Sequence, residues 1–101
     1  MQSHYAAQFD REHSCTEAEW MGWLPGASGE HALAIDGAHR SATVHIDAGR
    51  LTLQWLPLAP RRIALLNLPR MAVRYRFEGV DEAARAAFMR HFDRYTQRGG
   101  G

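Results

Sequence analysis

The fold of this chain is decided by its last third, residues 71-MAVRYRFEGVDEAARAAFMRHFDRYTQ-97. Between Met71 and Glu78 apolar and polar residues alternate, and because successive side chains on a strand point to opposite faces, this alternation predicts a strand with one buried face. After Gly79 the apolar residues recur at steps of three and four, which predicts an amphipathic helix that ends near Gln97. The expected buried positions are Val73, Tyr75 and Phe77 on the strand and Ala84, Ala87, Phe88, His91, Phe92 and Tyr95 on the helix. This helix is therefore expected to pack on the apolar face of the sheet that contains the strand.

The composition is that of one small globular domain. The chain has 101 residues, of which 46% are apolar and 23% charged, and these values predict a core that forms without a metal, a disulfide or a partner. All 12 basic residues are Arg, which is typical of a GC-rich bacterial genome, and the formal net charge is +1. Because a protein that coats nucleic acid needs a large excess of basic charge, the composition disfavours that class.

The sequence also predicts where the protein resides. Cys15 is the only cysteine, so no intramolecular disulfide can form and an oxidising compartment offers no structural advantage. The first twelve residues contain no apolar leader segment, and no apolar run in the chain approaches the length of a bilayer span. We therefore expect a cytoplasmic protein that does not associate with membranes.

Three regions are expected along the chain: a flexible arm over residues 1–13, a single domain over residues 14–97 and a flexible glycine-rich tail over residues 98–101. At the start of the domain, Thr16 and Glu19 have the spacing of a capping box, which predicts the beginning of a short helix. Pro25 and Gly26 are expected to end that helix. A short edge strand is the alternative for this segment, because Trp and Met also suit sheets.

Five antiparallel strands are expected between the two helices. Alternation and turn signals place four of them near residues 30–36, 42–47, 51–55 and 71–78, with Asp36-Gly37 and Asp47-Ala48-Gly49 as turns. Residues 63–68 are expected to form a strand that is apolar on both faces, and residues 56–60 an extended connection, because two prolines there lack donors. The predicted fold class is α+β: a five-stranded antiparallel meander or partly open barrel, with a short N-terminal helix and a packed C-terminal amphipathic helix.

The polar face of the predicted sheet is a candidate anion-binding surface. Its candidate residues are Arg62, Arg74, Arg76 and His45. Guanidinium groups that lie close together attract phosphate or carboxylate, because charge-assisted hydrogen bonds are about twice as strong as neutral ones. The alternative is an ordinary solvated face whose Arg side chains pair with nearby carboxylates.

An apolar surface is the second candidate. The short helix carries Trp20 and Trp23, and the predicted connection carries Leu56 and Leu58. Two Trp side chains exceed what a two-turn helix easily hides, and aromatic side chains are frequent anchors of interfaces, so these four residues are the candidate interface. The alternative is that both Trp side chains fill the open end of the sheet.

No motif predicts catalysis, a cofactor or a metal. Cys15 lies just before the first predicted helix, where the helix dipole would lower its pKa, but no oriented base accompanies it and we expect a semi-buried thiol. His31, His39 and His45 lie near the first predicted hairpin without any zinc-site spacing. The expected function is therefore non-catalytic: a binding or adaptor domain that contacts a protein partner or a second copy of itself. The alternative is an anion-binding domain for a nucleotide, an RNA or an acidic metabolite.

Overall fold

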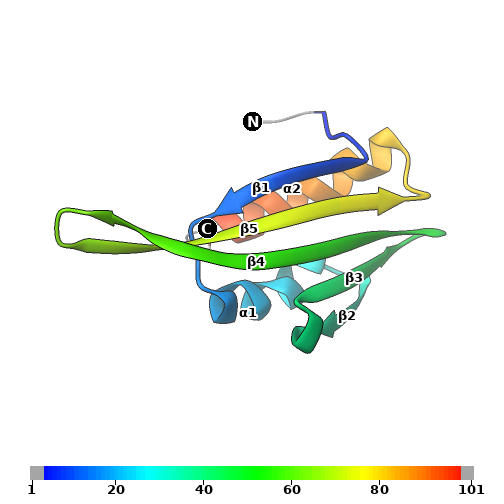
Figure 1. Ribbon diagram of the computed structural model, residues 1–101. Helices are drawn as coiled ribbons and strands as arrows, with labels where there is room; N and C mark the ends of the chain where they lie inside the picture. The colour runs from blue at the N-terminus through cyan, green and yellow to red at the C-terminus, as the bar shows by residue number, and fades with distance from the viewer. Residues whose placement is uncertain (1–3, 99–101) are drawn as a thin grey trace.

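The computed structural model describes residues 4–98 and shows the predicted α+β architecture (Figure 1). The elements in chain order are β1 (Gln8–His13), α1 (Glu17–Ser28), β2 (Ala32–Asp36), the 3-10 turn η1 (Gly37–His39), β3 (Ser41–Ile46), β4 (Gly49–Ile63), β5 (Leu66–Glu78) and α2 (Glu82–Arg98). The strands form one antiparallel sheet in the order β1-β5-β4-β3-β2. Within residues 4–98 β1 and β2 do not pair with each other, so the sheet is open rather than a closed barrel.

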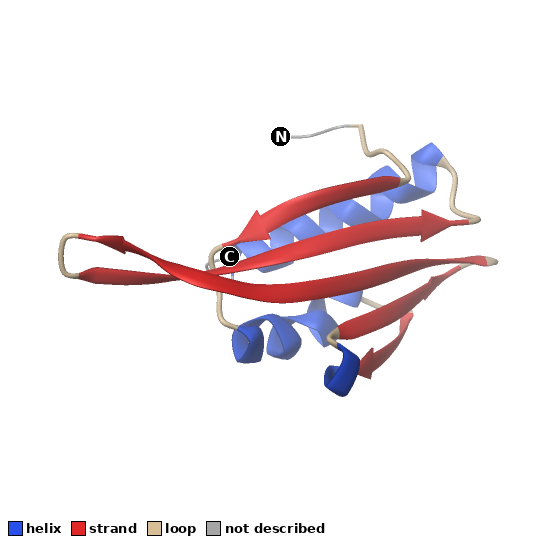
Figure 2. Cartoon of the chain, viewed as in Figure 1, coloured by secondary structure: helices blue, strands red, loops and turns tan. Residues whose placement is uncertain are grey.

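One face of this sheet forms the core together with both helices. Val73, Tyr75 and Phe77 on β5 are all buried, as the alternation predicted. Phe92 of α2 meets the Tyr75 ring edge-on at 5.8 Å, and Trp20 of α1 meets Phe92 in the same way at 5.9 Å. The opposite face of the sheet carries no helix and is open to solvent (Figure 2).

The N-terminal segment is an edge strand, so the prediction that ordered structure begins at residue 14 is wrong. β1 pairs antiparallel with β5, with Phe9 opposite Tyr75 and Arg11 opposite Val73. The alternation of β1 was hidden because Arg11 and His13 occupy positions that face the core. Residues 1–3 and 99–101 lie outside the described residues. Of the predicted tail over residues 98–101, only Arg98 is described, and it is the last residue of α2.

The capping box of α1 is confirmed, but the predicted end of this helix is not. The Thr16 hydroxyl accepts a hydrogen bond from the Glu19 amide at 3.1 Å, and the Thr16 amide donates to the Glu19 carboxylate at 2.9 Å. The helix continues past Pro25 to Ser28. Pro25 removes one intrahelical hydrogen bond, and the burial of Leu24 and Ala27 on either side of it stabilises the last turn.

β4 and β5 form one long hairpin, so the predicted connection over residues 56–60 and the separate strand over residues 63–68 are wrong. The register of β4 with β3 ends at Gln54, and that of β5 with β1 begins at Met71. Between these limits the two strands pair only with each other, and a proline that faces their open edges removes no ladder hydrogen bond. Pro57, Pro60 and Pro69 all lie in this part of the hairpin. We refer to residues 56–70 as the ribbon, which projects from the body of the molecule (Figures 1 and 2).

Candidate functional site

The ribbon exposes most of the large apolar side chains that solvent reaches. Five of the seven exposed large apolar side chains in the described part of the chain belong to it: Leu56, Ile63, Leu65, Leu66 and Leu68. The exposed fractions at the tip are 51% for Ile63, 102% for Leu65 and 60% for Leu66. An isolated two-stranded ribbon is only marginally stable in water, and a contiguous exposed apolar patch marks an interaction site.

The ribbon is also cationic. It contains Arg61, Arg62 and Arg70 and neither Asp nor Glu. Arg70 donates to both oxygens of Glu12 on β1, at 2.8 and 3.1 Å, and this guanidinium holds the pKa of Glu12 below its ordinary value. Arg61 lies 3.5 Å from the same carboxylate. Arg62 forms no ion pair with any residue between 4 and 98, so the ribbon keeps uncompensated positive charge beside its apolar tip.

The predicted interface is therefore corrected in part. Trp20 is fully buried and meets Trp55 edge-on at 6.1 Å, so it belongs to the core rather than to a surface. Trp23 is half-buried and packs against the same core. Leu56 is exposed and Leu58 half-buried, and both lie on the ribbon. The structure thus separates the two predicted halves of the interface, and only the leucines lie on a projecting surface.

The apolar tip of the ribbon was missed because its turn carries no turn residue. The connection between β4 and β5 is Ala64-Leu65, with Ala64 at a φ of 54°. This left-handed conformation favours Gly, Asn or Asp, and none of these residues is present. The signal that could have found the tip is the placement of Pro57 and Pro69 on either side of the apolar run, because both require strands with an open edge.

The open face of the sheet holds most of the predicted anion-binding residues. Arg74, Arg76 and His45 all project from this face, because each is exposed and alternates along its strand with side chains that are buried on the core face. Arg62 does not lie there: it is opposite Asn67 near the tip of the ribbon. Arg50, which lies between His45 and Glu78 in the register, was not among the predicted residues.

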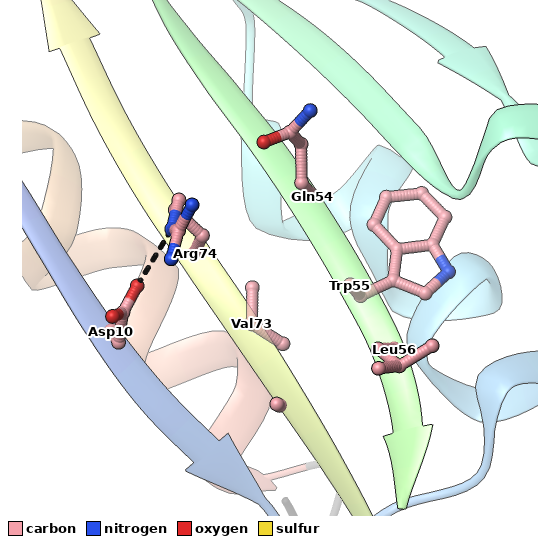
Figure 3. A pocket seen from close by; sticks show the side chains of 7 residues that line it. Asp10, Gln54, Trp55, Leu56, Val73 and Arg74 are labelled. Atoms are coloured by element: carbon pink, nitrogen blue, oxygen red, sulfur yellow. Dashed lines mark hydrogen bonds and ion pairs between the residues drawn. The ribbon is translucent and has the colours of Figure 1, made fainter.

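A shallow cavity of about 390 Å³ lies on this open face, between β1, β5 and β4 (Figure 3). Asp10, Gln54, Leu56 and Arg74 contribute to its lining. The Arg74 guanidinium donates to Asp10 at 3.2 Å, and Arg50 lies 3.4 Å from Glu78 in a second exposed pair. Two of the guanidinium groups that could attract an anion, those of Arg74 and Arg50, are thus already paired with exposed carboxylates.

The interior polar groups hold elements together. The Arg11 guanidinium forms a bidentate pair with Asp93 of α2, at 2.6 and 3.1 Å, and the Tyr5 hydroxyl donates to the same carboxylate at 2.6 Å. Arg11 also lies 5.4 Å from the centre of the Tyr75 ring, which is within the range of a cation–π contact. His13 and the Tyr75 hydroxyl are 2.7 Å apart. This network joins β1, β5 and α2.

Cys15 lies beside this network and does not have the environment of a nucleophile. Its side chain is buried, and burial together with the nearby Glu19 carboxylate raises its pKa to about 11. The thiol is therefore neutral at pH 7, whereas the thiolate is the reactive form. Its predicted helper, His13, is engaged with Tyr75.

Two further features follow from the described residues. No group of three His, Cys, Asp or Glu side chains among residues 4–98 is arranged to hold a metal ion. Neither helix within the same range is long and apolar enough to cross a bilayer.

No family model, curated protein or solved structure matches this chain. What its surfaces bind must therefore follow from their own geometry and charge.

Proposed function

We propose that this protein is a non-catalytic binding module that contacts a protein partner through the ribbon. The observation that carries this proposal is the exposed tip of Ile63, Leu65 and Leu66, set beside cationic side chains on a hairpin that projects from a well-packed body. The core already buries Trp20 and the apolar face of the sheet, so the tip has no role in covering the core. We also propose that it acts as an adaptor in the cytoplasm.

The chemistry of the ribbon indicates a partner other than a second ribbon. Pro57, Pro60 and Pro69 remove backbone donors from its edges, which disfavours the addition of a further strand. Two ribbons brought together would also place several Arg side chains against one another. A groove with an apolar floor and an acidic rim on another protein satisfies both the apolar tip and the charge, because complementary potentials favour association.

The test is capture of a partner from a lysate of the source organism, with variants that separate the tip from the body. Leu66→Asp is expected to abolish capture, because it places a charge at the centre of the apolar contact. Ile35→Asp is the matched control, since Ile35 is also an exposed strand residue, with 41% of its surface accessible, but lies on β2. Capture that both variants lose, or that neither loses, would contradict the proposal.

Two further measurements identify the chemistry of the contact. Arg62→Gln is expected to weaken the salt dependence of binding, since its guanidinium has no acidic partner within residues 4–98. Vesicles of anionic lipid are the control for a membrane surface, which also combines acidic groups with an apolar interior. Tip-dependent binding to such vesicles, without capture of a protein, would replace the protein partner with a lipid surface.

A second candidate function is anion binding on the open face of the sheet, for a nucleotide, an RNA or an acidic metabolite. It is favoured by Arg76, which lies between Thr52 and Gln8 in the register and has no acidic partner in the described chain. A thermal-shift screen with phosphates and nucleotides at two salt concentrations tests it. A shift that Arg76→Gln removes would support anion binding, and the absence of any shift would exclude it.

A further inference from the structure

A second cavity, also of about 390 Å³, lies between the end of α1, the β3–β4 turn and α2. The β3–β4 turn is at the opposite end of the sheet from the tip of the ribbon (Figure 1). The apolar lining of this cavity consists of Ile46 and Phe88, which are 3% and 5% exposed, together with alanines of α2. The volume falls within the range of small-molecule sites, and an apolar lining with a few polar groups is typical of such sites.

One of those polar groups lacks a partner. Ser28 lines the cavity and is 1% exposed, and its Oγ has no hydrogen-bond partner in the described chain. A buried hydroxyl without a hydrogen bond costs on the order of 1 to 3 kcal/mol. A polar ligand atom in the cavity would satisfy this hydroxyl.

The other polar groups of the cavity favour a cation. Among the described residues that line it, Glu30 and Asp47 are acidic, His31 and His91 carry imidazole rings, and none is Arg. His91, which also lines the cavity, donates through Nε2 to the carbonyl of Gly26 at 2.9 Å. α1 also ends at the cavity, and the C-terminal end of a helix attracts positive charge.

We propose that this cavity binds a small organic cation, an ammonium group carried on a short apolar body. The apolar body contacts Ile46 and Phe88, and the ring of Phe88 can also attract the charge. The ammonium donates to the Ser28 hydroxyl and is attracted by the carboxylates of Glu30 and Asp47. This site is independent of the ribbon, so neither proposal depends on the other.

The probes are benzylamine, benzyl alcohol and benzoate, which share one ring and differ in charge. Each is titrated to about 10 mM into the full-length protein while backbone amide signals are followed by NMR, a range that covers the millimolar dissociation constants expected of so small a ligand. Benzylamine is expected to give saturable shifts at residues 28–31, 46–47 and 84–91. Benzyl alcohol is expected to bind about tenfold more weakly, because a hydrogen bond from a charged group is stronger than one from a neutral group, and benzoate is not expected to bind.

Variants separate the cavity from the rest of the surface. Ala87→Phe is expected to fill the cavity and abolish binding, whereas Ala83→Phe, on the same helix but outside the lining, is expected to leave binding unchanged. Asp47→Asn is expected to weaken benzylamine binding about two- to fivefold, as for an exposed ion pair, and Asp10→Asn on the open face is expected to have no effect.

Three results would overturn the proposal. They are equal affinity for benzylamine and benzyl alcohol, saturable shifts confined to residues outside the cavity, and the absence of saturable shifts with benzylamine. Unchanged amide spectra of the unliganded variants show that each remains folded.

Discussion

At the scale of single residues, Cys15 is held in the thiol form. Because its pKa rises from the ordinary value of 9.0 to about 11, the thiolate fraction at pH 8 falls about 100-fold. We expect iodoacetamide to alkylate Cys15 in the folded protein at least 100-fold more slowly than in the denatured chain, as measured by mass spectrometry over time. Alkylation at the rate of a free cysteine would show that the thiol is accessible and activated.

The same pKa shift predicts a dependence of stability on pH. A thiol whose pKa is higher in the folded protein stabilises the fold in its neutral form, so its contribution is complete below pH 9 and is lost as the pH rises toward 11. We expect the free energy of unfolding to fall across this interval. Burial also raises the pKa of Tyr75, so the comparison with Cys15→Ala isolates the thiol: the variant should lose less stability over the same interval.

The Arg11–Asp93 pair gives the third prediction. The two side chains are only 24% and 19% exposed, and Asp93→Ala would remove the carboxylate that accepts from both the guanidinium and the Tyr5 hydroxyl. We expect this substitution to cost about 2 to 3 kcal/mol in chemical denaturation. Asp10→Ala, which removes an exposed partner of Arg74, is the control and should cost less than about 1 kcal/mol. Equal losses would mean that burial of the Arg11 pair has no energetic consequence.

At the scale of elements, two glycines have opposite roles. A Cβ at Gly49 would overlap the backbone carbonyls of Glu78 and Gly79, so Gly49→Ala requires the β3–β4 turn to move and is expected to cost about 1 to 3 kcal/mol. Gly22 lies within α1 with no atom near its Cβ position, and Gly22→Ala is expected to raise the free energy of unfolding by about 0.5 to 1 kcal/mol. Thermal unfolding of both variants measures the contrast, and a neutral Gly49→Ala would contradict the close approach.

Elements with a strict period could be predicted from the sequence, and those that depend on tertiary partners could not. β5 and α2 follow the periods of a strand and a helix, and Phe92 packs on Tyr75 as expected. Of the other predicted buried positions on α2, Phe88 is buried, whereas Ala87, His91 and Tyr95 are exposed. β1 was missed because Arg11 faces the core, where its charge is paired with Asp93, which lies 82 residues away in the chain. Trp20 was assigned to a surface because the side chains that bury it belong to the sheet and to α2, not to its own short helix. The ribbon was missed because its prolines would remove sheet hydrogen bonds only if a further strand paired with that edge. The sequence does not show where the neighbouring strand ends.

At the scale of the whole molecule, the features that suit binding lie at opposite ends of the sheet. The ribbon presents apolar and cationic side chains at one end, and the cavity beside Ser28 presents apolar and anionic groups at the other. Phe88 of the cavity belongs to the packed core and the centre of its ring lies 5.8 Å from that of Phe92, whereas residues 59–69 of the ribbon contribute no side chain to that core. Changes within residues 59–69 are therefore expected to leave the body folded.

This separation leads to a prediction about the ribbon as a unit. Leu58 and Arg70 are directly opposite each other, so replacement of residues 59–69 by Asn-Gly would close β4 and β5 with a two-residue hairpin. Because the deleted segment contributes no side chain to the core, we expect the free energy of unfolding in urea to change by less than about 1 kcal/mol, while capture of the protein partner is lost. A shortened protein that fails to fold would show that the ribbon belongs to the folding unit, and a folded one that still captures the partner would place the contact elsewhere on the body.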